Sequence, residues 1–163
     1  MDATRLFEEH HAALFRYLVR LTGDEDLAED VAQEAFVRLV TRPPREESLR
    51  AWLFTVATNL VRALANSTRR QKVLLESAAL RAGPEPWTDP AERAQASETR
   101  SRVREALDTL SEKERTVLLM REEGFSHREI AEAVGTTTGS VGTMIARALD
   151  KLARALPLDA DAL

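Results

Sequence analysis

Apolar residues recur at steps of three and four along most of the chain, and this spacing is typical of amphipathic α-helices. No stretch shows the sustained alternation of apolar and polar residues that a half-buried β-strand requires. The first apolar stripe is followed by Gly23, a residue suited to end a helix, and it consists of Leu6, Phe7, His10, Leu14, Tyr17, Leu18 and Leu21. The pattern predicts an all-α fold.

Two more apolar stripes follow. The second stops before Pro43-Pro44 and contains Leu27, Val31, Ala35 and Leu39, flanked by Ala28, Ala32 and Phe36. The third is the most strongly patterned and contains Leu49, Trp52, Leu53, Val56, Ala57, Leu60, Val61 and Leu64. Three such helices can share one core. For Trp52 we favour packing in this core, with a stacking platform for a base as the alternative.

A segment rich in structure-breaking residues divides the chain. Residues 82–90 contain one glycine and three prolines, and their composition differs from both flanks. We therefore expect two small helical domains joined by a flexible linker. The first domain is expected at 1–75, the linker at 76–102, the second domain at 103–157 and a tail at 158–163.

The signals for helix ends are clear in the second half. Asp89 before Pro90 suits the start of a helix that runs toward Leu110, because proline lacks an N–H that the first turn leaves unpaired anyway. Two later helices are expected to begin with a serine three residues before a glutamate, the reciprocal capping pattern, at Ser111/Glu114 and Ser126/Glu129. Gly124 and Gly135 are the matching stops.

The last two expected helices have the spacing of a helix-turn-helix. A short helix at 127–134, a turn at Gly135 and a longer helix from Thr138 fit this motif, whose second helix enters the DNA major groove. We expect its core face to hold Val141, Ile145, Ala148 and Leu149. The residues left for DNA are Thr138, Ser140, Gly142, Thr143, Ala146 and Arg147.

Three arginines, Arg115, Arg121 and Arg128, could lie along phosphates and set the register on DNA. An ordinary pair of packed helices with solvated arginines is the alternative. Gly139 and Gly142 each weaken a helix by roughly 1 kcal/mol relative to alanine. Either they allow a close approach to DNA, or the helix is locally weak.

Charge is distributed unevenly along the chain. The net charge of −4 opposes DNA binding taken by itself. However, residues 23–37 carry six acidic and no basic side chains, whereas residues 38–72 carry eight basic and two acidic ones. The first segment suits a basic protein partner or a solvated helix face, and the second suits a nucleic acid.

Other compositional features limit the function classes. The chain has no cysteine, which excludes disulfides and thiolate chemistry. It has no apolar run of membrane-spanning length and no signal-peptide pattern at its start, so we expect a cytoplasmic protein without membrane insertion. The histidines, His10, His11 and His127, do not form a metal-binding pattern, and Glu29 and Glu34 have neither a nucleophile nor a Gly-rich phosphate loop beside them. We expect no catalytic residue, metal, cofactor or small-molecule substrate.

Several segments resemble the extracytoplasmic-function (ECF) group of the sigma-70 family. Residues 21–38 (LTGDEDLAEDVAQEAFVR) look like region 2.2, and residues 48–60 (SLRAWLFTVATNL) resemble the helix that reads and melts the minus-10 element. Residues 107–115, 130–135 and 139–141 resemble region 4, which reads the minus-35 element. The similarity covers about 5–72 and 103–155.

The resemblance implies particular partners and contacts. Core RNA polymerase would be bound through its clamp coiled coil and its flap, with the clamp contacting Asp30, Gln33, Glu34, Phe36 and Arg38. The loop 41–48 would capture an unstacked promoter base, and minus-10 contacts would come from Arg42, Arg45, Arg50, Asn59, Arg62, Arg69 and Arg70. The minus-35 contacts would be Arg115, Arg121, Arg128, Thr138, Ser140, Gly142, Thr143 and Arg147. An anti-sigma factor is a further expected partner.

Two departures from the group leave details open. Gly142-Thr143-Met144 stands where the recognition helix usually has Lys-Ser-Arg, and Pro43-Pro44 stands where an aromatic residue is common. The strength of minus-35 binding and the preferred minus-10 base are therefore open. Two other functions also remain open: a stand-alone helix-turn-helix regulator, and a module that mimics sigma to sequester an anti-sigma factor or polymerase.

Overall fold

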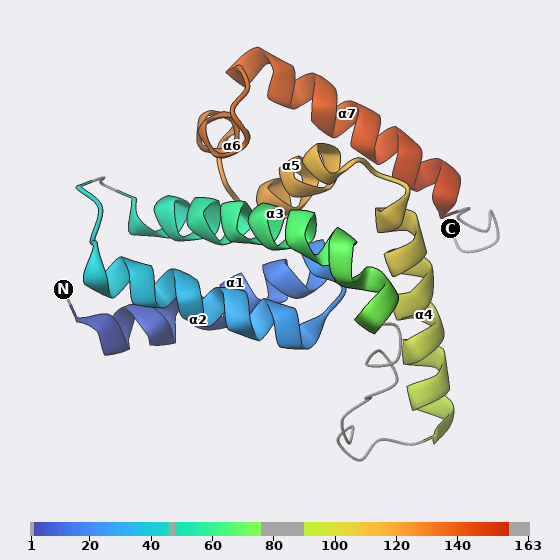
Figure 1. The fold of residues 1–163 in the computed structure, drawn as a ribbon. Coiled ribbons are helices and arrows are strands. Elements are labelled where there is room, and N and C mark those ends of the chain that lie inside the picture. The colour runs from blue at the N-terminus through green and yellow to red at the C-terminus, as the bar shows by residue number, and fades with distance from the viewer. Residues whose placement is uncertain (1, 46–47, 76–89, 157–163) are drawn as a thin grey trace.

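The structure, a computed structural model, describes residues 2–45, 48–75 and 90–156, with seven α-helices and no strand in those ranges. The all-α expectation is confirmed. The helices are α1 (Ala3–Thr22), α2 (Glu25–Thr41), α3 (Leu49–Leu75), α4 (Pro90–Asp108), α5 (Glu112–Glu122), α6 (His127–Val134) and α7 (Thr138–Ala155). Figure 1 shows α3 lying between the α1–α2 pair and α5–α6, with α7 running across the top from α6 and α4 along the right-hand side. None of the described helices is both long and apolar enough to cross a membrane.

Helices α1, α2 and α3 form the expected three-helix core. Asp2 caps α1 by accepting from the backbone of Thr4 and Arg5, and Gly23 ends it with φ 73°, a left-handed conformation that favours glycine. In the core, the Tyr17 hydroxyl and Thr58 Oγ1 lie 2.7 Å apart and share a hydrogen bond. Burial raises the pKa of Tyr17, so this hydroxyl stays protonated.

Helices α5, α6 and α7 begin where the sequence indicated. Both expected capping boxes are present, with Ser111 and Glu114 bonding reciprocally at α5 and Ser126 and Glu129 at α6. Gly135 ends α6 with φ 72°. The helix-turn-helix geometry therefore follows from local capping signals, which need no distant contact to operate.

The structure corrects the expected place of Leu149 on the core face. Leu149 is 50% exposed and lies off the core face, because Ala148 takes the buried position against Leu107 and Leu110 and its neighbour points about 100° away. Residues 90–102 of the segment assigned to the linker form the first part of α4, the helix that was expected to begin at Pro90 and to run toward Leu110. The third helix runs to Leu75, beyond its apolar stripe. The remaining linker, 76–89, and the tail, 158–163, lie outside the described residues.

The two halves of the molecule share one continuous apolar core. Phe54 of α3 and Phe125, between α5 and α6, are both buried, and their rings meet edge to face with centroids 4.9 Å apart. Such aromatic pairs add about 0.5–1.5 kcal/mol beyond the area they bury. Trp52 is half-buried against the same core, which favours the packing interpretation.

Glu114 is a buried carboxylate that links α5 to α7. Lys151 Nζ donates to Glu114 Oε1 at 2.7 Å, and the Ser111 N–H donates to the same oxygen at 3.1 Å. The Lys151 bond is the largest influence and lowers the pKa of Glu114 below its ordinary 4.5, against the opposing effect of burial. Because the folded pKa is the lower one, the carboxylate stabilises the fold above pH 4.5, and this stabilisation is lost as the pH falls through the folded pKa.

We expect Glu114→Gln to destabilise the fold by about 1–2 kcal/mol at neutral pH, since it removes the charge from a largely buried carboxylate that accepts from Lys151 and from the Ser111 N–H. The difference from the wild type should shrink as the pH falls below 4.5. Urea unfolding over a pH series measures both effects. Glu105→Gln, an exposed position on α4 with the same charge change, is the control. A gap between Glu114→Gln and wild type that widened in acid would contradict the assignment.

Candidate nucleic-acid interface

The acidic helix α2 presents a continuous polar face. Asp30, Gln33, Glu34 and Arg38 are all exposed. Gln33 Nε2 donates to Glu29 Oε1 at 3.3 Å, and Arg38 Nε donates to Glu34 Oε1 at 3.1 Å, so successive turns are linked along the helix. Exposed pairs of this kind contribute only about 0.3–0.5 kcal/mol. The face is therefore not needed for folding and is available to a partner.

Phe36, expected among the polymerase contacts, lies instead in the core with 8% of its surface exposed. Its ring packs 5.1 Å from that of Phe7, which stacks in turn on His11 at 4.3 Å. A buried ring cannot make the surface contact that the sequence suggested. Its place in the fold is to fix α2 against α1 and so to orient the exposed face.

The expected minus-10 residues fall into three groups. Asn59 on α3 is exposed, as are Arg42 and Arg45 in the connection that precedes α3. Arg50 and Arg62 on α3 are half-buried and engaged with the other half of the chain. Arg69 and Arg70 belong to the C-terminal part of α3, and their side chains lie outside the described residues.

The recognition helix α7 begins at a side-chain cap. Thr137 Oγ1 accepts from the Ser140 N–H at 3.2 Å and lies 2.7 Å from Ser140 Oγ. The first turns of α7 line an open hollow formed by Thr136, Thr137, Gly139, Ser140, Thr143, Met144 and Arg147. This hollow combines hydroxyls, the first backbone turn of a helix and one guanidinium, which are suited to phosphate and base contacts.

Among the expected minus-35 residues, Ser140, Thr143 and Arg147 line this hollow. Thr138, Thr143 and Arg147 are exposed, and Ser140 and Gly142 are half-buried. Arg121 on α5 is exposed, and Arg128 on α6 is exposed with Glu132 at 3.6 Å. Arg115 on α5 is also half-buried, and its guanidinium is engaged with other groups of the chain.

No contact among the described residues requires a glycine at position 139. A Cβ built there meets no atom within 4 Å, and one at Gly142 meets only His127 Cε1, at 3.9 Å. We expect Gly139→Ala to stabilise the protein by about 0.5–1 kcal/mol through helix propensity. Urea denaturation measures this effect. Gly135→Ala is the contrast, since its φ of 72° makes the added Cβ destabilising; destabilisation by Gly139→Ala would refute this account of α7.

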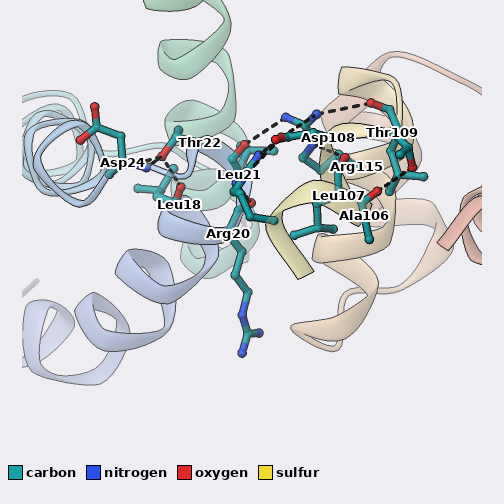
Figure 2. Close-up of polar contacts among 12 residues, drawn as sticks. Leu18, Arg20, Leu21, Thr22, Asp24, Ala106, Leu107, Asp108, Thr109 and Arg115 are labelled. Carbon is teal, nitrogen blue, oxygen red and sulfur yellow. Dashed lines mark hydrogen bonds and ion pairs between the residues drawn. The ribbon is translucent and has the colours of Figure 1, made fainter. Parts of the chain in front are cut away.

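Arg115 is held by three backbone carbonyls. It donates to Leu107 O at 3.0 Å, to Leu110 O at 3.3 Å, and to Leu21 O at the end of α1 at 3.3 Å. Figure 2 shows Arg115 beside Leu21 and Leu107, with Asp108 on the same side. Burial lowers the pKa of Arg115, and nearby Arg104 adds to the effect. In this conformation the Arg115 guanidinium satisfies carbonyl groups at the C-terminal ends of α4 and α1. It would have to leave these carbonyls before it could contact a phosphate.

Glu123 forms the centre of a second set of contacts between the two halves. Its side chain is only 6% exposed, and Arg16 of α1 binds it through two hydrogen bonds of 3.2 and 3.0 Å. Arg50 of α3 donates to its carbonyl oxygen and lies 4.0 Å from its carboxylate. Sequence reasoning missed Arg16 and Glu123, because they are 107 positions apart and belong to no local motif.

Comparison with known proteins identifies the family. The family models described as "Sigma-70 region 2" and "Sigma-70, region 4" match residues 6–71 and 100–152. The ECF RNA polymerase sigma factor SigL of Mycobacterium tuberculosis is 36% identical over 141 residues, which cover 83% of this chain and 78% of SigL. The chain belongs to the ECF group of the sigma-70 family.

Other relatives agree with this assignment. The ferric citrate uptake sigma factor FecI of Escherichia coli is 30% identical over 89% of this sigma factor and 85% of FecI. Two solved structures share its fold. The sigma factor RpoE of Bartonella quintana, in complex with the anti-sigma factor NepR, has a TM-score of 0.69 at 21% identity, covering 96% of this chain and 97% of that one. CnrH in complex with the cytosolic domain of CnrY has a TM-score of 0.68 at 24% identity, covering 93% and 85%.

The family assignment gives the two halves of this sigma factor their names. Domain 2 consists of α1, α2 and α3 and carries the acidic face. Domain 4 consists of α5, α6 and α7, with α4 packed on α7, and carries the helix-turn-helix. Within the described ranges, no group of His, Asp or Glu side chains is placed to hold a metal ion.

Proposed function

We propose that this chain binds core RNA polymerase through the exposed face of α2 and directs it to promoters read by both domains. The observation that carries the proposal is the match of both sigma-70 regions, in order, on one chain. The face formed by Asp30, Gln33, Glu34 and Arg38 supports it, because an exposed acidic helix suits a basic protein surface. The protein acts in the cytoplasm as an initiation factor and catalyses no reaction itself.

Promoter recognition is divided between the domains. Domain 2 contacts the minus-10 strand through Arg42, Arg45, Arg50, Asn59 and Arg62, with Arg69 and Arg70 as further contacts. Domain 4 contacts the minus-35 element through the first turns of α7. Each contact alone binds DNA weakly. When both domains are held on one polymerase, the second contact forms at a high effective concentration, so the combined affinity is much higher than that of either contact. A net charge of −4 is therefore compatible with promoter binding.

We also propose control by an anti-sigma factor. RpoE and CnrH, whose folds this chain shares, were solved in complex with NepR and with the cytosolic domain of CnrY. An anti-sigma factor that covers α2 would prevent polymerase binding. Co-purification with a candidate anti-sigma factor, and loss of the complex on charge reversal in α2, would test this.

Transcription reconstituted with core polymerase on promoter libraries tests the function and separates it from the alternatives. Our proposal expects defined start sites that appear only when polymerase and this chain are both present. A stand-alone regulator would bind duplex DNA without polymerase, and a sequestering mimic would bind polymerase or an anti-sigma factor without producing start sites. Absence of defined start sites would refute the proposal.

We expect Gly142→Lys to raise minus-35-dependent transcription. The position lies on the half-buried edge of α7 beside the hollow, where an added ammonium could reach a phosphate, and a phosphate contact strengthens binding without changing sequence preference. Transcription from promoters with and without their minus-35 element measures the effect. Gly142→Ala is the control for helix propensity. Output no higher than that of the alanine variant would show that the missing cation is unimportant.

A further inference from the structure

The turn between α5 and α6 occupies a cradle on domain 2 that has the chemistry of a single-strand binding site. The cradle consists of Arg16 on α1 and of Arg50 and Phe54 on α3. The Arg50 guanidinium lies 4.2 Å from the ring centroid of Phe125 and 5.3 Å from that of Phe54. Its terminal nitrogen also donates to the Glu123 carbonyl oxygen.

The turn presents the same groups that a nucleic-acid strand would present. The Glu123 carboxylate accepts two parallel hydrogen bonds from Arg16, the arrangement in which arginine also binds phosphate. Phe125 lies over Arg50 as an unstacked base would, since guanidinium planes and aromatic rings are the usual stacking surfaces for single strands. An anion and a ring, two residues apart, thus fill one basic and aromatic site.

We propose that residues 123–125 are an intramolecular competitor for the site on domain 2 that binds the promoter strand, and that Arg16 is a further nucleic-acid-binding residue of that site. This inference rests on the proposed function, because it takes Arg50 to be a minus-10 contact. In the closed state Glu123 and Phe125 occupy Arg16 and Arg50. When the domains separate on polymerase, the same side chains bind a phosphate and a base.

Neighbouring contacts also engage basic side chains between the two domains. Arg62 of domain 2 lies 3.8 Å from Glu112 of domain 4, and Arg104 and Arg115 donate to backbone carbonyls at the end of α1. Four arginines expected or available for nucleic acid, Arg16, Arg50, Arg62 and Arg115, are thus engaged between the halves of the closed chain. Closure therefore engages these positive charges with groups of the chain itself, and opening frees them for nucleic acid.

Opening can be measured on the full chain. The chain has no cysteine, so Ala12→Cys on α1 and Ala153→Cys on α7, both exposed, allow a donor and an acceptor dye to report the separation of the domains. Glu123→Gln should lower energy transfer and should raise affinity for a labelled single-stranded oligothymidylate by about tenfold, because apparent affinity scales with the open fraction. Glu122→Gln is the matched control, an exposed neighbour with the same charge change.

The role of Arg16 is tested in the opened background. If Arg16 only holds the turn, Arg16→Gln added to Glu123→Gln should leave oligothymidylate affinity unchanged. If it binds the strand, affinity should fall several-fold, and Arg20→Gln, on the exposed side of the same helix, should have a smaller effect. Equal effects of Arg16→Gln and Arg20→Gln would overturn the assignment of Arg16.

The competition is overturned if Glu123→Gln raises oligothymidylate affinity no more than Glu122→Gln does, or if it leaves energy transfer unchanged. Transcription by the wild-type chain with core polymerase is recorded in parallel. Defined start sites without a gain in oligothymidylate affinity would refute the competition and leave the sigma function intact. Absence of start sites would refute the proposed function whatever the oligothymidylate result.

Discussion

Replacement of Phe54 by alanine is expected to destabilise the protein by about 3–5 kcal/mol, the usual range for removing a buried aromatic ring. Phe54 is fully buried, and its ring centroid lies 5.1 Å from that of Tyr17 and 4.9 Å from that of Phe125. Removal of this ring therefore opens a cavity where the two domains meet. Urea unfolding at neutral pH measures the loss. The slope of the transition should also show whether both domains still unfold together.

The control for this substitution is Phe7→Ala, which removes the same ring from a position that is 42% exposed. Phe7 stacks on His11 and packs at a tilt against Phe36, so a cost of about 1 kcal/mol is expected there. If Phe54→Ala lowers the free energy of unfolding no more than Phe7→Ala does, the continuous core between the domains does not hold the fold together.

The second large effect is expected at the face of α2. Asp30→Lys combined with Glu34→Lys should lower polymerase-dependent transcription roughly 10- to 100-fold, because like charges placed across an interface cost several kcal/mol. Both side chains are exposed, so the free energy of unfolding should change by less than about 1 kcal/mol. Run-off transcription and urea unfolding of the same preparations separate the two effects.

The matched control reverses two exposed charges elsewhere. Glu98→Lys combined with Glu105→Lys on α4 changes the net charge by the same amount and so produces any general gain in attraction to DNA. Transcription should remain within a few-fold of wild type in this control. Similar losses in both double variants would indicate a general charge effect and would remove α2 as the polymerase-binding face.

The sequence predicted those features of the fold that depend on near neighbours in the chain. The capping boxes at Ser111 and Ser126 and the stop at Gly135 each require residues within four positions, and they place α5, α6 and α7 correctly. Leu149 shows the limit of this reasoning, because helical spacing alone gives an apolar face about 100° wide and does not say which edge is covered.

The contacts between the domains were beyond sequence reasoning. Arg115 and Arg50 were expected to bind DNA because they are basic and lie in suitable segments, and the structure places both against carbonyls or carboxylates far away in the chain. An arginine can donate to a phosphate, to a carboxylate or to the carbonyls at a helix C-terminus, so its residue type does not choose among them. The partner of each of these arginines is determined by the packing of domain 2 on domain 4.

Direct association with core RNA polymerase is the measurement that tests the central claim. The purified chain, free of any anti-sigma factor, is titrated with bacterial core polymerase over a range of ionic strengths, and complex formation is followed by fluorescence anisotropy. We expect saturable binding that weakens as salt increases, since the α2 face is charged and exposed. Failure to bind at every ionic strength, by a preparation that is folded, would contradict the assignment of this chain as a sigma factor.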